Sequence, residues 1–244
     1  MSPEQGLASL LAFTNPWEIV ALLAALICLR LVAAPAASHR RWRGYVLELA
    51  DSGIIAVLLI FCIVRPFFIQ AFLIPSGSMH PTLLEGDRIM VNKLVYFFRP
   101  PRHGEIVVFH APEWADPLRR DFIKRVIGLP GDRICIRGGH VIRNGQPLNE
   151  PYVAEPPMYE WPTSQYYVLR PMDQPRPING GEITVPDGYI FVLGDNRNAS
   201  NDGHAWQATG ADGREYPCPF VPRENVLGKA MFIFWPPQRV GLVR

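Results

Sequence analysis

Hydrophobic and polar positions divide the chain into two parts with different patterns. The first part contains two long apolar runs with a short basic stretch between them. The second part, from Asp87 onward, consists of short alternating or apolar segments separated by turn residues such as glycine, proline and asparagine. Long unbroken apolar runs are typical of membrane-spanning helices, whereas alternation with a period of two is typical of strands. The pattern predicts two N-terminal transmembrane helices and then a mainly β domain.

The predicted transmembrane helices cover residues 17–35 and 52–70. Arg30 and Arg65 lie near the ends of these runs, where a long charged side chain reaches the polar surface of a bilayer. A cleavable signal peptide is the alternative for the first run, but the residues before it include Glu4 and no basic cluster. A buried core helix is the alternative for the second run.

The basic stretch between the runs, residues 38–45, sets the expected orientation. It contains His39-Arg40-Arg41-Trp42-Arg43, and short loops rich in arginine stay on the cytoplasmic side of a membrane. Two crossings then place everything after the second run on the opposite side. We therefore expect a membrane anchor over residues 1–74 and an extracytoplasmic β domain over residues 75–244.

The strands of that domain are expected at the alternating segments. Asn144-Gly145 is the clearest hairpin turn, because both central residues of a type I′ turn need positive φ. Residues 150–187 are rich in proline and are expected to form a loop-rich insertion with one hairpin near residues 165–169. The predicted strands are Arg88–Asn92, Glu105–Phe109, Phe122–Ile127, Arg133–Arg137, Val141–Arg143, Tyr189–Leu193 and Val226–Trp235.

Composition excludes several classes of function. The net charge of +2 gives no electrostatic support for a nucleic-acid partner. The chain has no HExxH motif and no paired CxxC spacing, so we expect neither a metal nor a cofactor. A disulfide between Cys135 and Cys218 stays open at this point, because spacing alone does not show that two thiols meet.

Ser78 is the first candidate for chemistry, because it stands in a polar, turn-rich segment just after the second apolar run. A serine becomes a nucleophile only when a base lies within hydrogen-bond reach. His80 is two residues away, and in an extended chain those two side chains share a face. The chain has no GxSxG motif, which would place a serine beside a histidine in a hydrolase of that type.

Lys124 is the other candidate base. Only three of the 24 basic residues are lysines, and Lys124 is surrounded by arginines. In a strand it shares a face with Phe122 and Val126, and apolar surroundings lower the pKa of an ammonium. An arginine could not act as a base, because it stays protonated. A solvated or salt-bridged lysine is the alternative, and these residues alone leave both open.

Four segments together resemble the bacterial type I signal peptidases, membrane-bound serine/lysine peptidases. The resemblance runs from the second apolar run to about residue 235, and the combination of motifs is highly specific. The segments are Pro75-Ser76-Gly77-Ser78-Met79-His80-Pro81-Thr82-Leu83, Gly86-Asp87-Arg88-Ile89-Met90-Val91-Asn92-Lys93, Ile123-Lys124-Arg125-Val126-Ile127-Gly128-Leu129-Pro130-Gly131-Asp132 and Gly194-Asp195-Asn196-Arg197.

The resemblance implies the roles of the site residues. Ser78 would be the nucleophile and Lys124 the general base, and the Ser78 N–H with the Ser76 hydroxyl would form the oxyanion hole. Ser200 would orient the Lys124 amine. A serine that only serves its turn or loop is the alternative for Ser76 and for Ser200.

Four charged residues near the site would be structural: Arg125, Asp195, Arg197 and Asp202. Asp195 and Arg125 are expected to form an ion pair. The chain departs from the family pattern at Asn198, where aspartate is common, and at Gly203-His204, where the family has Ser-Arg. Asp202 therefore lacks its usual arginine neighbour, which puts the ion pair that braces this loop in doubt.

The resemblance also implies a substrate, a fold and a location. Signal peptides would bind in extended form by strand addition, beside Ile74, Pro75, Asp121, Phe122 and Ile123. The fold would be the signal-peptidase/repressor-protease-like β fold, at the extracytoplasmic face of the bacterial cytoplasmic membrane. The alternative function is a related peptidase dedicated to a single pilin or conjugation substrate.

An apolar surface for contact with the lipid bilayer is expected from Phe67, Phe68, Phe72 and Leu73. Tyr96, Phe97 and Phe98 could extend it, but we expect these three residues in the core.

Overall fold

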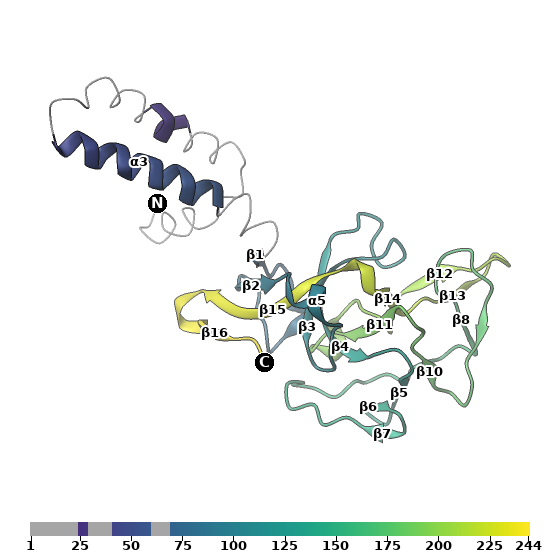
Figure 1. Ribbon diagram of the computed structural model, residues 1–244. Coiled ribbons are helices and arrows are strands. Elements are labelled where there is room, and N and C mark those ends of the chain that lie inside the picture. The colour runs from purple at the N-terminus through teal and green to yellow at the C-terminus, as the bar shows by residue number, and fades with distance from the viewer. Residues whose placement is uncertain (1–23, 29–40, 60–68) are drawn as a thin grey trace. The chain divides into compact units, whose positions relative to one another are not determined.

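The computed structural model describes residues 24–28, 41–59 and 69–244 (Figure 1). The chain divides into two compact units, one up to Ala71 and one from Phe72 to Arg244. The second unit contains nearly all of the described strands, and the candidate site residues lie in it.

The described part of the first unit is helical at residues 24–28 and in α3, Arg41–Leu59. Two predictions need correction here. The basic stretch 38–45 is not a loop throughout, because α3 begins at Arg41. The predicted helix 52–70 does not extend to its expected end, because Ile69 and Gln70 belong to strand β1. Arginine is a good helix former, and no proline interrupts the sequence between Arg41 and Leu59. Among the described residues, no helix is both long and apolar enough to cross a membrane, and most of the predicted span 17–35 lies outside them.

An eight-stranded sheet forms the centre of the β domain, in the order β1-β2-β15-β3-β4-β11-β14 with β16 paired to β15. In Figure 1 the long strand β15, in yellow, runs beside β2 and β3. The strands are β1 (Ile69–Leu73), β2 (Arg88–Asn92), β3 (Ile106–His110), β4 (Asp121–Gly128), β11 (Tyr189–Leu193), β14 (Phe220–Pro222), β15 (Val226–Trp235) and β16 (Gly241–Leu242).

Shorter elements complete the domain. A second sheet has the order β10-β5-β6-β7, and two ribbons pair β8 with β9 and β12 with β13. Their bounds are β5 (Arg133–Arg137), β6 (His140–Arg143), β7 (Gln146–Pro147), β8 (Tyr166–Tyr167), β9 (Arg176–Pro177), β10 (Ile183–Thr184), β12 (Gln207–Thr209) and β13 (Glu215–Pro217). The short helices are η3 (Gly77–Met79), α5 (Val95–Phe98), η4 (Arg197–Ala199), η5 (Arg223–Asn225) and η6 (Pro237–Arg239).

The mainly β fold is confirmed, and each of the seven predicted strands is present within about one residue of its expected bounds. The predicted turn is confirmed too, since Asn144 and Gly145 have φ values of 54° and 78° between β6 and β7. The expected hairpin near residues 165–169 appears as the two-residue pair of β8 and β9. Cys135 and Cys218 are both buried free thiols, so no disulfide joins them in the described domain.

The large sheet is buried on both faces, which explains its continuous apolar strands. In β3, Ile106 and Val108 belong to one core cluster, whereas Val107 and Phe109 belong to another. Successive side chains of a strand point to opposite faces, so a strand covered on both sides needs apolar residues at every position. A charged residue in such a strand loses its contact with water and needs a compensating interaction or a function.

One edge segment of the sheet has no strand partner. β3 pairs with β4 along Asp121 to Arg125, but β11 pairs with β4 only from Arg125 to Gly128. On its β11 side, β4 therefore carries no strand partner over residues 121–124 within the described part of the chain. This short open edge lies directly beside Lys124.

Candidate active site

The side chains of Ser78 and Lys124 meet inside the domain. Ser78 belongs to the single turn η3, and Lys124 comes from the middle of β4. The Lys124 Nζ donates to Ser78 Oγ at 2.8 Å and to the Ile123 carbonyl at 3.0 Å. Lys124 is 4% exposed and Ser78 is 9% exposed. The structure thus brings together the two residues that the sequence singled out separately.

The surroundings of Lys124 favour its neutral form. Burial lowers the pKa of Lys124 from its ordinary value of 10.5 to about 8, although the negative charges of Asp202 and Asp195 act in the opposite direction. Phe122 lies on the same face of β4, with the Nζ 5.6 Å from its ring centroid. An amine with this pKa is partly neutral near physiological pH and can accept a proton from the serine that it contacts.

His80 does not occupy the position of a base. Its Nε2 is buried and has no hydrogen-bond partner in the described structure, so it does not bind the Ser78 hydroxyl. The proximity of the two residues in sequence did not bring the imidazole to the serine, because Ser78 and Met79 turn through η3 before His80. Lys124 is therefore the base that the geometry supports.

The segment Gly194 to Arg197 holds the backbone of the serine turn. A Cβ on Gly194 would lie 2.4 Å from the Ser78 carbonyl oxygen and 2.3 Å from Ser200 Oγ, so only glycine fits there. The Asn196 N–H donates to the Ser78 carbonyl, and its side-chain amide donates to the Gly77 carbonyl, each at 3.1 Å. These contacts fix the position of η3, and Asn196 is a functional residue to which sequence reasoning gave no role.

Arg125 and Asp195 form the predicted ion pair. The guanidinium is bidentate, with Nε 2.8 Å from Oδ1 and an Nη 2.6 Å from Oδ2. Arg125 is 2% exposed and Asp195 is completely buried. Two partners were not foreseen: Thr82 donates its hydroxyl to Asp195, and the Arg125 guanidinium lies 3.8 Å from the ring centroid of Tyr152. Thr82 belongs to the same sequence motif as Ser78, and this position in the motif was the signal from which its role could have been predicted.

Arg197 is a second buried cation, and its partner is also distant in sequence. It donates to both carboxylate oxygens of Glu150, at 2.6 and 2.8 Å, and to the Gly194 carbonyl at 3.0 Å. Glu150 lies at the start of the proline-rich insertion, so this ion pair connects the insertion to the loop of residues 194–204, which we call the catalytic loop. A bidentate pair requires arginine, because lysine lacks the planar fork.

Asp202 has a partner despite the missing arginine. His204 Nδ1 lies 2.7 Å from Asp202 Oδ1, and the Gly194 N–H donates to Oδ2 at 2.7 Å. Asn198, the other departure, connects the loop to the insertion: it accepts from the Met158 N–H at 2.8 Å and donates to the Pro156 carbonyl at 3.0 Å. The loop is therefore braced by residues that differ from the family pattern.

The predicted contact between Ser200 and Lys124 is not formed in this structure. The Ser200 hydroxyl is buried and has no hydrogen-bond partner in the described residues, although it lies next to Gly194. Ser76 is exposed, has an extended backbone and makes no capping hydrogen bond at the start of η3. The roles expected for both hydroxyls remain predictions.

The residues that we expect to bind the substrate differ in their exposure to solvent. Ile74 is buried and Pro75 is exposed at the start of the serine segment, and Phe122 and Ile123 are half-buried on β4. Asp121 is exposed, and the ring Nδ1 of His110 lies 2.7 Å from its carboxylate. No metal-binding group of three His, Cys, Asp or Glu side chains occurs among residues 24–28, 41–59 and 69–244.

The prediction that Phe97 and Phe98 lie in the core is wrong. They are 76% and 84% exposed on the single turn α5, and Tyr96 is half-buried. Tyr96 and Phe97 line a cavity of about 340 Å³, together with Lys93, Arg223 and Val226. A turn of four residues is too short to present one apolar face inward, so its aromatic residues point in several directions.

Comparison with known proteins assigns these features to a family. The family model "Signal peptidase, peptidase S26" matches residues 46–235. The probable signal peptidase I-1 of Synechocystis is 41% identical over 192 residues, which are 77% of this chain and 80% of that protein. The signal peptidase I of Leptolyngbya laminosa is 40% identical over 214 residues, which are 86% of this chain and 89% of that protein. A solved signal peptidase I of Enterococcus faecalis, 26% identical, covers 54% of this chain and 97% of its own, with a TM-score of 0.34.

Proposed function

We propose a mechanism and a location for a chain that belongs to the signal peptidase family, peptidase S26. It is a signal peptidase I, a serine endopeptidase that removes the signal peptides of preproteins. A peptidase dedicated to one pilin or conjugation substrate is not favoured, because relatives at about 40% identity are named for the general activity. The hydrogen bond from Lys124 Nζ to Ser78 Oγ is the observation that supports the mechanism.

The first step forms an acyl-enzyme. Neutral Lys124 accepts the hydroxyl proton of Ser78 while Ser78 Oγ attacks the scissile carbonyl carbon. The carbonyl oxygen becomes an oxyanion, and the Ser78 N–H and the Ser76 hydroxyl donate to it. The charged Lys124 then gives its proton to the leaving amine, and the mature protein departs.

The second step releases the signal peptide. Neutral Lys124 accepts a proton from a water molecule, whose oxygen attacks the acyl carbon of Ser78. The ester bond breaks, and Ser78 Oγ recovers a proton from Lys124. Ser200 Oγ and the Ser78 carbonyl oxygen both lie next to Gly194, and in the substrate complex the Ser200 hydroxyl orients the Lys124 amine.

The substrate binds to the open edge of β4. A strand offers its free N–H and C=O groups to an extended peptide, which adds as a further strand and places alternate side chains in shallow pockets. The free segment 121–124 ends at the catalytic lysine, so a peptide bound there passes the dyad. Asp121, Phe122 and Ile123 would contact the peptide from β4, with Ile74 and Pro75 on the opposite side.

The enzyme acts at the extracytoplasmic face of the bacterial cytoplasmic membrane, and its first 74 residues are the anchor. The apolar runs of the sequence support the anchor, and the exposed Leu73, Phe97 and Phe98 support contact of the catalytic domain with the bilayer. A signal peptide remains in the membrane while its cleavage site emerges at the surface, which requires a nucleophile close to that surface.

The proposed mechanism is tested with matched variants of the full chain in membranes. Ser78→Ala and Lys124→Arg should each reduce preprotein cleavage by at least about a thousandfold, because the first removes the nucleophile and the second keeps a permanent cation in place of the base. Lys229→Arg is the control, since Lys229 is a half-buried lysine in an ion pair with Glu105. Sequencing of the new N-terminus identifies the bond that is cut. Cleavage that survives in Lys124→Arg, with a normal melting temperature, would contradict the mechanism.

A further inference from the structure

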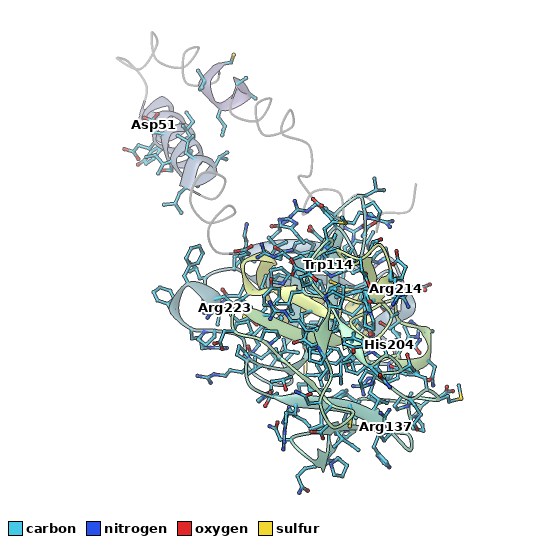
Figure 2. All side chains as sticks on the ribbon, turned by 90° about the vertical axis from the view of Figure 1, so that its right-hand side faces the viewer. Asp51, Trp114, Arg137, His204, Arg214 and Arg223 are labelled. Atoms are coloured by element: carbon cyan, nitrogen blue, oxygen red, sulfur yellow. The ribbon has the colours of Figure 1, made fainter. Side chains whose placement is uncertain are left out.

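His204 stands at the end of the catalytic loop and contacts a single carboxylate. Its Nδ1 lies 2.7 Å from Asp202 Oδ1, and its backbone N–H donates to the same oxygen at 3.3 Å. The imidazole is partly buried, with a side-chain exposure of 18%, and Figure 2 labels it among the packed side chains of the domain. The ring and the carboxylate therefore form a close pair whose total charge depends on one proton.

Asp202 connects this pair to the dyad. It is completely buried, and its second oxygen accepts a hydrogen bond from the backbone N–H of Gly194. Gly194 in turn packs against the Ser78 carbonyl. The negative charge of Asp202 raises the pKa of Lys124, against the larger effect of burial. A charge placed beside Asp202 consequently changes the electrostatic effect of this carboxylate on the Lys124 amine.

The remaining groups around His204 do not supply a second variable charge. Tyr159 stacks on the imidazole with ring centroids 4.1 Å apart, and burial raises the pKa of its phenol, so it stays neutral. Arg197 and Glu150 act on Tyr159 from beyond the ring and are paired with each other. Asp195, the other carboxylate that acts on Lys124, is paired with Arg125. Of these side chains, the imidazole of His204 is the one that contacts the Asp202 carboxylate directly.

We propose that His204 is a positioning residue of the dyad: through Asp202, its protonation state sets how strongly the site favours the charged form of Lys124. This inference rests on the proposed function, in which Lys124 is the base. At this position the family pattern has an arginine, which would neutralise Asp202 at every pH. The histidine of this chain neutralises it only when protonated.

The direction of the effect follows from Coulomb's law. With a cation at position 204, Asp202 is compensated and Lys124 loses its proton at a lower pH. With a neutral side chain at that position, Asp202 is uncompensated and Lys124 keeps its proton to a higher pH. Two substitutions bracket the natural residue: His204→Arg fixes the positive charge, and His204→Gln keeps a hydrogen-bond donor without a charge.

The titration of Lys124 is measured directly by NMR. The chain has only three lysines, so the protein labelled with carbon-13 at lysine Cε gives three signals, and Lys124→Met identifies one of them. The full chain in detergent micelles is titrated for the natural protein and both variants. His140→Arg and His140→Gln make the same charge changes at an exposed histidine on β6 and are the matched controls.

The Lys124 midpoint of His204→Arg is expected to lie below that of His204→Gln by about half a pH unit or more, and the midpoint of the natural protein should not fall outside this interval. The His140 variants should leave the midpoint unchanged. Equal midpoints in the three proteins, or the reverse order, overturn the inference, as does an equal shift in the His140 variants. The pH profile of preprotein cleavage is recorded in parallel: if it fails to follow the Lys124 midpoint, the role of Lys124 as base fails while the inference on its titration stands.

Discussion

Two neighbouring residues of β4 show two opposite ways to bury a positive charge. The Arg125 guanidinium is neutralised by a bidentate carboxylate, donates to the Gly104 carbonyl and lies over the Tyr152 ring. The Lys124 amine, one residue earlier, donates only to neutral oxygens of Ser78 and Ile123 among the residues that the structure describes. The ion pair of Arg125 holds the structure around it in place, whereas the neutral partners of Lys124 allow its amine to lose a proton.

The difference explains why the site needs both residues. A base must be able to lose its proton, which requires burial without a close anion. A nucleophile must be held within reach of that base, which requires a stiff support. Asp195 serves the second purpose: it binds Arg125 and Thr82, and its neighbour Asn196 holds the Ser78 backbone. Each of the following predictions changes either the support around Arg125 and Asp195 or the reactive group Lys124.

The largest expected effect comes from breaking the support. Arg125→Ala leaves Asp195 as a buried carboxylate without its cation, and loss of one partner of such a pair costs about 3–5 kcal/mol of unfolding free energy. Arg133→Ala makes the same change at an exposed arginine that lies 3.5 Å from the half-buried Glu182, and it should cost less than about 1 kcal/mol. Denaturant unfolding measures both variants. Equal losses in the two would show that the Arg125 pair does not support the fold.

Lys124→Met removes the reactive charge and should stabilise the domain at neutral pH. The folded protein holds Lys124 at a pKa of about 8, against 10.5 in the unfolded chain, so between these pH values the unfolded state binds more protons. The stability of the natural protein therefore rises across this window, by about 3 kcal/mol from this residue. The advantage of the variant should be largest below pH 8 and should disappear by about pH 10.5.

Unfolding curves at several pH values measure this difference. Lys93→Met is the control for the loss of a half-buried lysine that belongs to neither the dyad nor its support. A constant difference between Lys124→Met and the natural protein would mean that Lys124 keeps its ordinary pKa when folded.

Proton loss by Lys124 also sets the expected pH dependence of cleavage. The reactive form is neutral, so the ratio kcat/KM for a preprotein should rise with pH to a plateau, with a midpoint near the Lys124 pKa of about 8. Well below the midpoint the rise should be about tenfold per pH unit. Steady-state assays across this range measure it, and an activity that falls with rising pH below 8 contradicts the assignment of the base.

The smallest expected effects compare two hydroxyls beside the dyad. Thr82→Val removes a hydrogen bond to the buried Asp195 carboxylate and should cost about 1–3 kcal/mol of stability. Ser200→Ala removes a buried hydroxyl without a partner and should leave stability within about 1 kcal/mol or increase it. If the Ser200 hydroxyl orients Lys124 in the substrate complex, kcat should fall in Ser200→Ala although stability does not. Thermal unfolding and single-turnover cleavage separate the two.

The strands were predictable from local patterns, and the dyad from short motifs that resemble those of the family. Short alternating or apolar segments between turn residues defined β2, β5, β11 and β15 to the residue. Burial of Lys124 was one of the two alternatives left open by its position beside Phe122 and Val126 on one face of β4, and the structure confirms it. The expected lowering of the Lys124 pKa by apolar surroundings agrees with the burial of its amine.

The partners of the other charged residues were not predictable, because each lies far along the chain. Glu150 is 47 positions from Arg197, and Tyr159 reaches His204 from the proline-rich insertion. The charge of an arginine does not identify which of the many carboxylates it will pair with, because the pairing depends on how the insertion folds against the rest of the domain. The helix boundaries near Arg41 and Ile69 were also misplaced, because apolar content does not mark where a helix gives way to a strand.

The open edge of β4 has a consequence for self-association. A strand with unpaired backbone groups is a template for any extended chain, including the same segment of a second molecule. Here the template is only four residues long, and Asp121 places an exposed charge at its outer end. Parallel pairing of two copies through this edge would bring their Asp121 carboxylates together, whereas antiparallel pairing would place each Asp121 opposite Lys124 of the other copy. The short length of this edge therefore limits the association of two copies through β4.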